Sequence, residues 1–245
     1  MRLDLATWPE VDVYLKSVPG IIVPTGSTEQ HGPMGLIGTD AICAQQIAEG
    51  AADIVEAYVA PTIAYTPAPF NTAFPGTISV SEPLFEALVK EILGGLVQQG
   101  FKFVYFLNGH GANLAPLKRA AQSLEGVAIR IRSWWEYDTV NALRGEFYGD
   151  WEGMHATPSE VAITQATHRT ISSGSAATPP KKLSAEYIRK HMGDRHGPPD
   201  RHREQFPDGR VGSHSALANP ENGRTLMGAA IKALADDYLN LLGSN

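Results

Sequence analysis

Acidic residues and histidines gather in three short segments of the sequence, and their chemistry points to a metal centre. In the first segment, residues 26–33, Glu29 and His31 are two positions apart, so an extended backbone would point both side chains the same way. Asp40 follows at the start of a helical pattern. Two carboxylates and an imidazole close together suit a borderline divalent metal. Two alternatives stay open: Glu29 and His31 lie in a solvated loop, and Asp40 only caps the helix.

The second segment, residues 108–113, reads NGHGAN and directly follows the apolar run 103–107. The glycines on either side of His110 let the backbone turn sharply and bring the imidazole close to other groups. The alternative is an ordinary strand-to-helix turn in which Asn113 is the N-cap. We expect Asn108 and Asn113 to hold the loop rather than react.

The third segment, residues 155–160, reads HATPSE. If Pro158 opens a helix, Glu160 lies in its first turn. A carboxylate at a helix start can have no role beyond its favourable interaction with the helix dipole. Taken alone, this segment favours that interpretation.

The elements that must position these segments alternate along the chain. Apolar runs predict buried strands at 20–25, 58–63, 103–107 and 127–131. Apolar residues at helical spacing predict helices at 43–54, 85–96, 114–124, 158–167 and 227–241. Strands separated by helices of this length predict an α/β fold with a mostly parallel sheet flanked by helices. We expect a single domain over residues 1–245.

Two of the three segments directly follow predicted strands, so we expect them at the carboxyl edge of the sheet, where open α/β sheets place their sites. Residues 193–214 are rich in Gly, Pro, Arg and His and predict a long polar loop that could cover the site. We expect its histidines, His202 and His214 among them, to be solvated. Trp134 and Trp135 could line the pocket or belong to the core.

Composition excludes several other classes of protein. The 245 residues carry a net charge of −6 with no long basic run, which argues against nucleic-acid binding. Residues 1–14 lack the features of a signal peptide, and no run approaches the roughly 20 apolar residues of a membrane span. The one cysteine, Cys43, cannot form a disulfide within the chain. We therefore expect a cytoplasmic protein that binds neither membrane nor nucleic acid.

Together these segments resemble the motifs of the creatininase family. GSTEQHGP at 26–33, followed by GTD at 38–40, looks like the family's first signature. NGHGAN at 108–113 is similar to its second motif and HATPSE at 155–160 to its third, while FPGTIS at 74–79 matches another family stretch. Four motifs in the family order make the resemblance specific.

The resemblance implies a flavodoxin-like, layered α/β fold that assembles as a homo-oligomer such as a hexamer. It also implies two divalent metal ions per subunit, Zn²⁺, Mn²⁺ or Fe²⁺. Glu29, Asp40 and His110 would hold one ion, with Asp40 bridging. His31, Asp40 and Glu160 would hold the other.

The function implied is hydrolysis of a carbon–nitrogen bond other than a peptide bond, in a small cyclic amide, formamide or related compound. A hydroxide bridging the two ions would attack the amide carbon. His155 and Glu160 are the expected catalytic residues, with His155 passing a proton to the leaving nitrogen. Two alternatives remain: a peptidase that trims a peptide precursor, and a catalytically silent ligand-binding or assembly protein.

The sequence also departs from the family pattern near the expected site. Creatinine-hydrolysing members carry a glutamate within the second motif, whereas here a Gly-Ala pair follows His110. This leaves Glu160 as the candidate ligand and argues against creatinine itself as the substrate. Many relatives have a histidine in the loop at 66–74, where this chain has Asn71 and Thr72. The substrate pocket is therefore expected to differ from that of creatinine-hydrolysing members.

Overall fold

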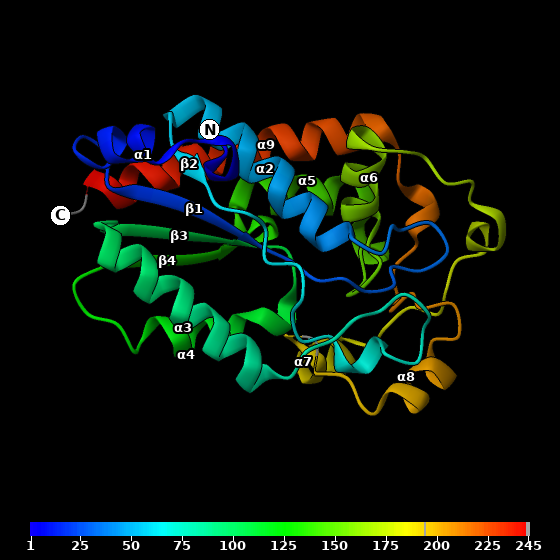
Figure 1. Ribbon diagram of the computed structural model, residues 1–245. Helices are drawn as coiled ribbons and strands as arrows, with labels where there is room; N and C mark the ends of the chain where they lie inside the picture. Colours follow the sequence, from blue (N-terminus) through cyan, green and yellow to red (C-terminus); the bar gives the residue numbers. More distant parts are fainter. Residues whose placement is uncertain (194, 244–245) are drawn as a thin grey trace.

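Four parallel strands form the central sheet, in the order β2-β1-β3-β4 (Figure 1). The structure, a computed structural model, describes residues 1–193 and 195–243. The strands are β1 (Gly20–Thr25), β2 (Tyr58–Val59), β3 (Phe103–Asn108) and β4 (Ala128–Ser133). The prediction of a parallel sheet is confirmed. Only β2 is much shorter than the predicted 58–63. Ala60 donates to the carbonyl of Ile22, but Ile63 rather than Thr62 donates to that of Pro24, so one extra residue interrupts the regular ladder to β1.

Helices cover both faces of this sheet, as the alternation of elements predicts. Figure 1 shows α2, α5, α6 and α9 on one side and α3 with α4 on the other. Alternate residues of β1 supply the two apolar cores: Ile22 packs into the first layer, whereas Ile21 and Val23 pack into the second. None of the described helices is both long and apolar enough to cross a membrane. The helices are α1 (Trp8–Leu15), α2 (Thr39–Val55), α3 (Glu82–Gln99), α4 (Leu114–Ala121), α5 (Asp138–Tyr148), α6 (Pro158–Thr167), α7 (Ala185–His191), α8 (Pro199–Gln205) and α9 (Pro220–Gly243).

The starts of two helices decide where the acidic side chains lie. α6 begins at Pro158 because Thr157 forms a capping box with Glu160 and proline is favoured in the first turn. α2 begins at Thr39, so Asp40 falls in its first turn. Both helix starts lie at the carboxyl ends of the strands (Figure 1), which brings the two carboxylates to the same edge of the molecule.

The expectation of a solvated loop at 193–214 is only partly right: most residues from 195 to 207 are exposed, whereas residues 209–214 are buried. This segment contains α8, and its His202 and His214 side chains are buried, at 3% and 9% exposure. The His202 ring packs edge-on against Phe70, with the ring centroids 5.1 Å apart. The polar composition of the segment suggested that these histidines are exposed to solvent, but aromatic side chains from distant segments cover both of them.

Helices α6 and α9 approach so closely that a glycine is needed between them. A Cβ at Gly223 of α9 would lie 1.9 Å from the carbonyl oxygen of Ala162. Gly223→Ala is therefore expected to destabilise the fold by about 1–3 kcal/mol, because two backbones must separate. Gly228→Ala, on the same helix with nothing within 4 Å, should instead stabilise it by about 0.5–1 kcal/mol. Urea unfolding of both variants measures the two changes, and equal effects would contradict the close packing.

Candidate metal centre

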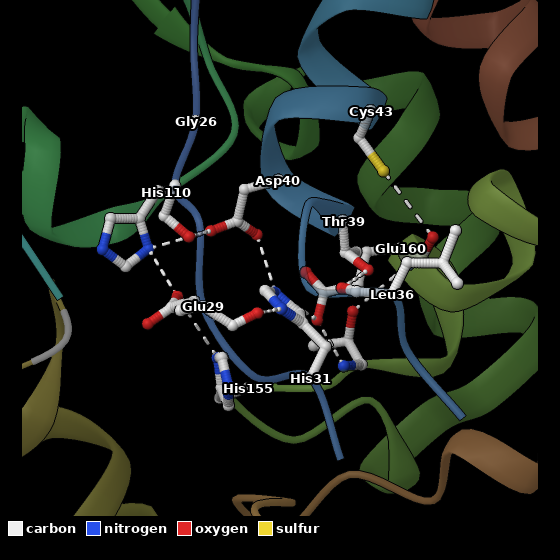
Figure 2. Close-up of polar contacts among 12 residues, drawn as sticks. Gly26, Glu29, His31, Leu36, Thr39, Asp40, Cys43, His110, His155 and Glu160 are labelled. Atoms are coloured by element: carbon white, nitrogen blue, oxygen red, sulfur yellow. Dashed lines mark hydrogen bonds and ion pairs between the residues drawn. The ribbon is translucent and has the colours of Figure 1, made fainter. Parts of the chain in front are cut away.

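Five side chains from four separate segments converge at the carboxyl edge of the sheet (Figure 2). Glu29 and His31 come from the loop after β1, and His110 from the turn after β3. Asp40 comes from the first turn of α2 and Glu160 from that of α6. All five are buried, with Glu160 the most exposed at 7%. The structure thus brings together every residue that the sequence analysis proposed as a metal ligand.

Asp40 is the centre of this cluster because it faces a histidine on each side (Figure 2). Its Oδ1 lies 2.8 Å from His31 Nε2, and its Oδ2 lies 3.1 Å from His110 Nδ1. Glu29 Oε1 is 3.0 Å from the same His110 nitrogen, and Glu160 Oε1 is 3.9 Å from His31 Nε2. Two three-residue groups result: Glu29–Asp40–His110 and His31–Asp40–Glu160, with donor atoms within 4.8 Å of one another.

Backbone carbonyls set the orientation of both histidines. His110 Nε2 lies 2.8 Å from the carbonyl oxygen of Pro67, and His31 Nδ1 lies 3.1 Å from that of Glu29. A carbonyl oxygen only accepts, so each of these nitrogens carries a proton and donates it. The other nitrogen of each ring faces the carboxylates and is the one that can bind a metal. A histidine held in this way through its second nitrogen is typical of metal sites.

The charges of the cluster call for cations. Three carboxylates are buried together, and among the described residues they form no ion pair with Lys or Arg. Burial lowers the pKa of His31, but the carboxylates of Asp40, Glu160 and Glu29 outweigh burial and raise it to about 10. Burial raises the pKa of Glu160 to about 8, with Asp40 adding to the shift. Without metal, protons must therefore balance the carboxylate charge.

One buried oxygen also lacks the partner that a metal would provide. Glu29 Oε1 is enclosed and makes no hydrogen bond of acceptable geometry, although His110 Nδ1 lies 3.0 Å away. A buried carboxylate oxygen without a hydrogen-bond partner destabilises the folded state. The donor set of carboxylates and imidazoles therefore fits divalent ions such as zinc or manganese.

The simpler interpretations of these segments are only partly right. Asp40 does not cap α2, because its oxygens face His31, His110 and the Ser27 hydroxyl, which donates to Oδ2 at 2.7 Å. Asn113 precedes α4 without capping it, and its amide instead donates to the carbonyl of Gly26. Glu160 belongs to the capping box of α6 and also lies in the cluster. Its Oε1 accepts from Thr157 N at 2.5 Å while facing His31.

His155 lies beside the cluster and is also held by the backbone. Its Nε2 lies 2.7 Å from the carbonyl oxygen of Gln30, and the side-chain amide nitrogens of Gln30 and Asn71 lie 3.0 and 3.1 Å from the same ring nitrogen. Its Nδ1 then faces Glu29 Oε1 at 3.9 Å (Figure 2). Together with Glu29 and His31, His155 also forms a third possible ligand group.

Two amide side chains that the sequence analysis did not propose as site residues complete the surroundings. Asn71 Nδ2 donates to Glu29 Oε2 at 2.8 Å, and Gln30 Nε2 donates to Asn71 Oδ1 at the same distance. Gln30 also donates to the carbonyl of Gly209. The departure from the family at residues 71–72 was the one available signal. This departure includes Asn71, the residue whose amide orients Glu29.

Asn71→Ala is expected to weaken metal binding by about 10–100-fold, because Glu29 loses the bond that turns Oε1 toward His110. Competition with a chromogenic chelator measures the affinity. Thr72→Ala is the control, since its hydroxyl bonds only within the same turn, to the carbonyl of Pro69. Equal affinities for both variants and the unchanged protein would show that Asn71 does not orient the ligand.

A cavity of about 530 Å³ opens onto the cluster. Asp40, His110, His155 and Glu160 form one part of its wall. Its other walls include Trp134, Trp135, Asn141, Arg144, Met154, Ile188 and Met192. The volume lies in the range of small-molecule sites, and the mixture of apolar walls with a few polar groups is typical of them.

Comparison with known proteins relates the sequence to a family and the fold to solved structures. The sequence matches the creatininase (creatinine amidohydrolase) family model over residues 4–238. The fold superposes on a crystal structure of creatinine amidohydrolase with a TM-score of 0.81 at 18% identity, covering 100% of this chain and 98% of that one. A structure described as manganese creatininase gives a TM-score of 0.78 at 18% identity, covering 96% of both chains.

Curated relatives are similar over part of the chain. The mycofactocin precursor peptide peptidase of Mycolicibacterium smegmatis is 37% identical over 113 residues, which is 44% of this chain and 45% of that protein. The 3-dehydro-scyllo-inosose hydrolase of Thermotoga maritima is 34% identical over 156 residues, 62% of this chain and 49% of that protein. The chain thus spans about half the length of these curated relatives. Since the family model matches nearly the whole sequence and the fold is the same, the chain belongs to the creatininase family of hydrolases.

Proposed function

We propose that this chain is a metal-dependent amidohydrolase that cleaves a carbon–nitrogen bond, other than a peptide bond, in a small cyclic amide, formamide or related compound. The observation that carries the proposal is the pair of buried ligand groups sharing Asp40, placed against a cavity of small-molecule size. The family description, creatinine amidohydrolase, names the same bond type.

The ligand groups suggest two ions in each subunit. Glu29 and His110 would hold one, His31 and Glu160 the other, and the two oxygens of Asp40 would serve both. Matched structures described as manganese and Zn–Zn creatininase support these metals. When bound, such ions supply Lewis acidity toward a carbonyl and lower the pKa of water into the neutral range.

His155 is the proposed proton carrier toward the leaving nitrogen. The carbonyl of Gln30 holds its Nε2, so Nδ1 is directed toward Glu29 and the cavity. Histidine suits this role because the pKa of an unperturbed imidazole lies near neutral pH. Glu160 has the proposed double role of ligand and of catalytic carboxylate, because it lines the cavity while facing His31.

A second candidate is cleavage of a peptide precursor. It is favoured by the 37% identity to a mycofactocin precursor peptide peptidase. The same ligand groups would serve either reaction, because both attack an amide carbon.

The test is a metal-replete purification followed by a substrate screen. Zinc- and manganese-loaded protein should contain about two ions per chain by plasma mass spectrometry. Small lactams, formamides, 3-dehydro-scyllo-inosose and short peptides are then assayed by NMR. Release of amine from a lactam or formamide supports the proposal, and cleavage confined to peptides supports the second candidate. Absence of bound metal would indicate a silent binding protein instead.

A further inference from the structure

Arg144 of α5 is the one lysine or arginine among the described residues that line the cavity beside the metal centre. Its side chain is mostly buried, at 17% exposure. A buried guanidinium at the wall of a substrate cavity keeps its positive charge and needs oxygen acceptors. We propose that Arg144 makes this cavity selective for amides that also carry a carboxylate. This inference rests on the proposed function and names its class of substrate.

The surroundings of Arg144 hold the guanidinium in a fixed place. Its Nε donates to Glu152 Oε1 at 2.9 Å. The hydroxyl of Ser159, the residue before the candidate ligand Glu160, donates to the same oxygen. The guanidinium carbon lies 6.0 Å from the centroid of the Trp134 ring. Fixing the group before the ligand arrives reduces the entropy lost on binding.

These contacts leave the terminal nitrogens of Arg144 available. Nη1 reaches Asn141 Oδ1 only at 3.4 Å, and no described residue accepts a hydrogen bond from Nη2. Two adjacent N–H groups in one plane match the two oxygens of a carboxylate. Asp40, Glu136 and Glu160 line the same cavity, so a singly charged carboxylate is better tolerated there than a doubly charged phosphate.

The remaining walls define the rest of the substrate. Trp134, Trp135 and Met154 are large and mostly apolar, and they line the cavity together with Arg144 and the metal centre. The fitting molecule therefore places its amide at the metal centre, its apolar body against the tryptophans and its carboxylate at Arg144. An N-acylated amino acid has this arrangement.

The experiment compares two probes of nearly the same shape, N-formylglycine and N-formylglycinamide, on the zinc-loaded protein by calorimetry. The unchanged protein should bind the carboxylate at least tenfold more tightly than the carboxamide. Arg144→Met should reduce that ratio to within about twofold, and Arg144→Lys should give an intermediate ratio. Arg201→Met, on the exposed surface of α8, should keep the full preference.

A preference that survives Arg144→Met would overturn the inference, because the carboxylate would then bind elsewhere, such as at the metals. An unchanged protein without any preference would overturn it too. If circular dichroism shows that Arg144→Met does not fold, Arg144→Gln and Arg144→Lys make the same comparison. Tight carboxylate binding without hydrolysis of any amide contradicts the proposed function alone. Equal kcat/KM for neutral and carboxylate-bearing amides contradicts this inference alone.

Discussion

Asp40→Asn is expected to remove metal from both ligand groups and to reduce hydrolysis by about a thousandfold, since Lewis-acid assistance contributes several kcal/mol. Asp40 is the one residue common to the Glu29–Asp40–His110 and His31–Asp40–Glu160 groups. An asparagine can offer one neutral oxygen but cannot supply charged oxygens to two ions. Metal per chain and kcat/KM measure the loss, with the metal content falling from about two ions to nearly none.

Asp53→Asn is the matched control for this substitution. It makes the same chemical change on the same helix, α2, at a side chain that is 83% exposed. Because surface ion pairs contribute little, this variant should keep its metal and its rate. An Asp40→Asn protein that retains two ions would show that the two groups do not share a bridging carboxylate.

His155→Ala is expected to lower kcat by about 10²–10⁴-fold while leaving the metal content unchanged. The physical reason is the orientation of the ring, whose Nε2 contacts the Gln30 carbonyl and the amides of Gln30 and Asn71 and whose Nδ1 faces the cluster. Removing the ring removes the proton carrier but none of the proposed ligands. Steady-state kinetics and metal analysis of the same preparation measure both quantities.

Two outcomes would assign His155 differently. Loss of metal would make it a ligand in the third group, with Glu29 and His31. Full metal together with full rate would exclude any part in the chemistry. His168→Ala is the control, because this exposed histidine at the end of α6 lies outside the cluster.

The sequence by itself was sufficient to predict the frame of the fold. Residues 20–25 and 158–167 were predicted with the bounds that β1 and α6 have. Local signals explain this success, because a continuous apolar run and a capping box with proline are complete within a few residues. The signal failed at 193–214, where His202 is buried against Phe70. A contact between such distant residues leaves no mark in local composition.

For the candidate site, the sequence determined which residue types stand at the carboxyl ends of the strands and at two helix starts. Only the tertiary structure decided how they face one another. Which nitrogen of His110 faces the carboxylates depends on the carbonyl of Pro67, which lies 43 residues away in the chain. Asn71 joined the site through a contact with Glu29, 42 residues away, and Arg144 because it lines a cavity whose walls come from several segments. Side-chain orientation is fixed by hydrogen bonds between segments, and spacing along one segment cannot encode it.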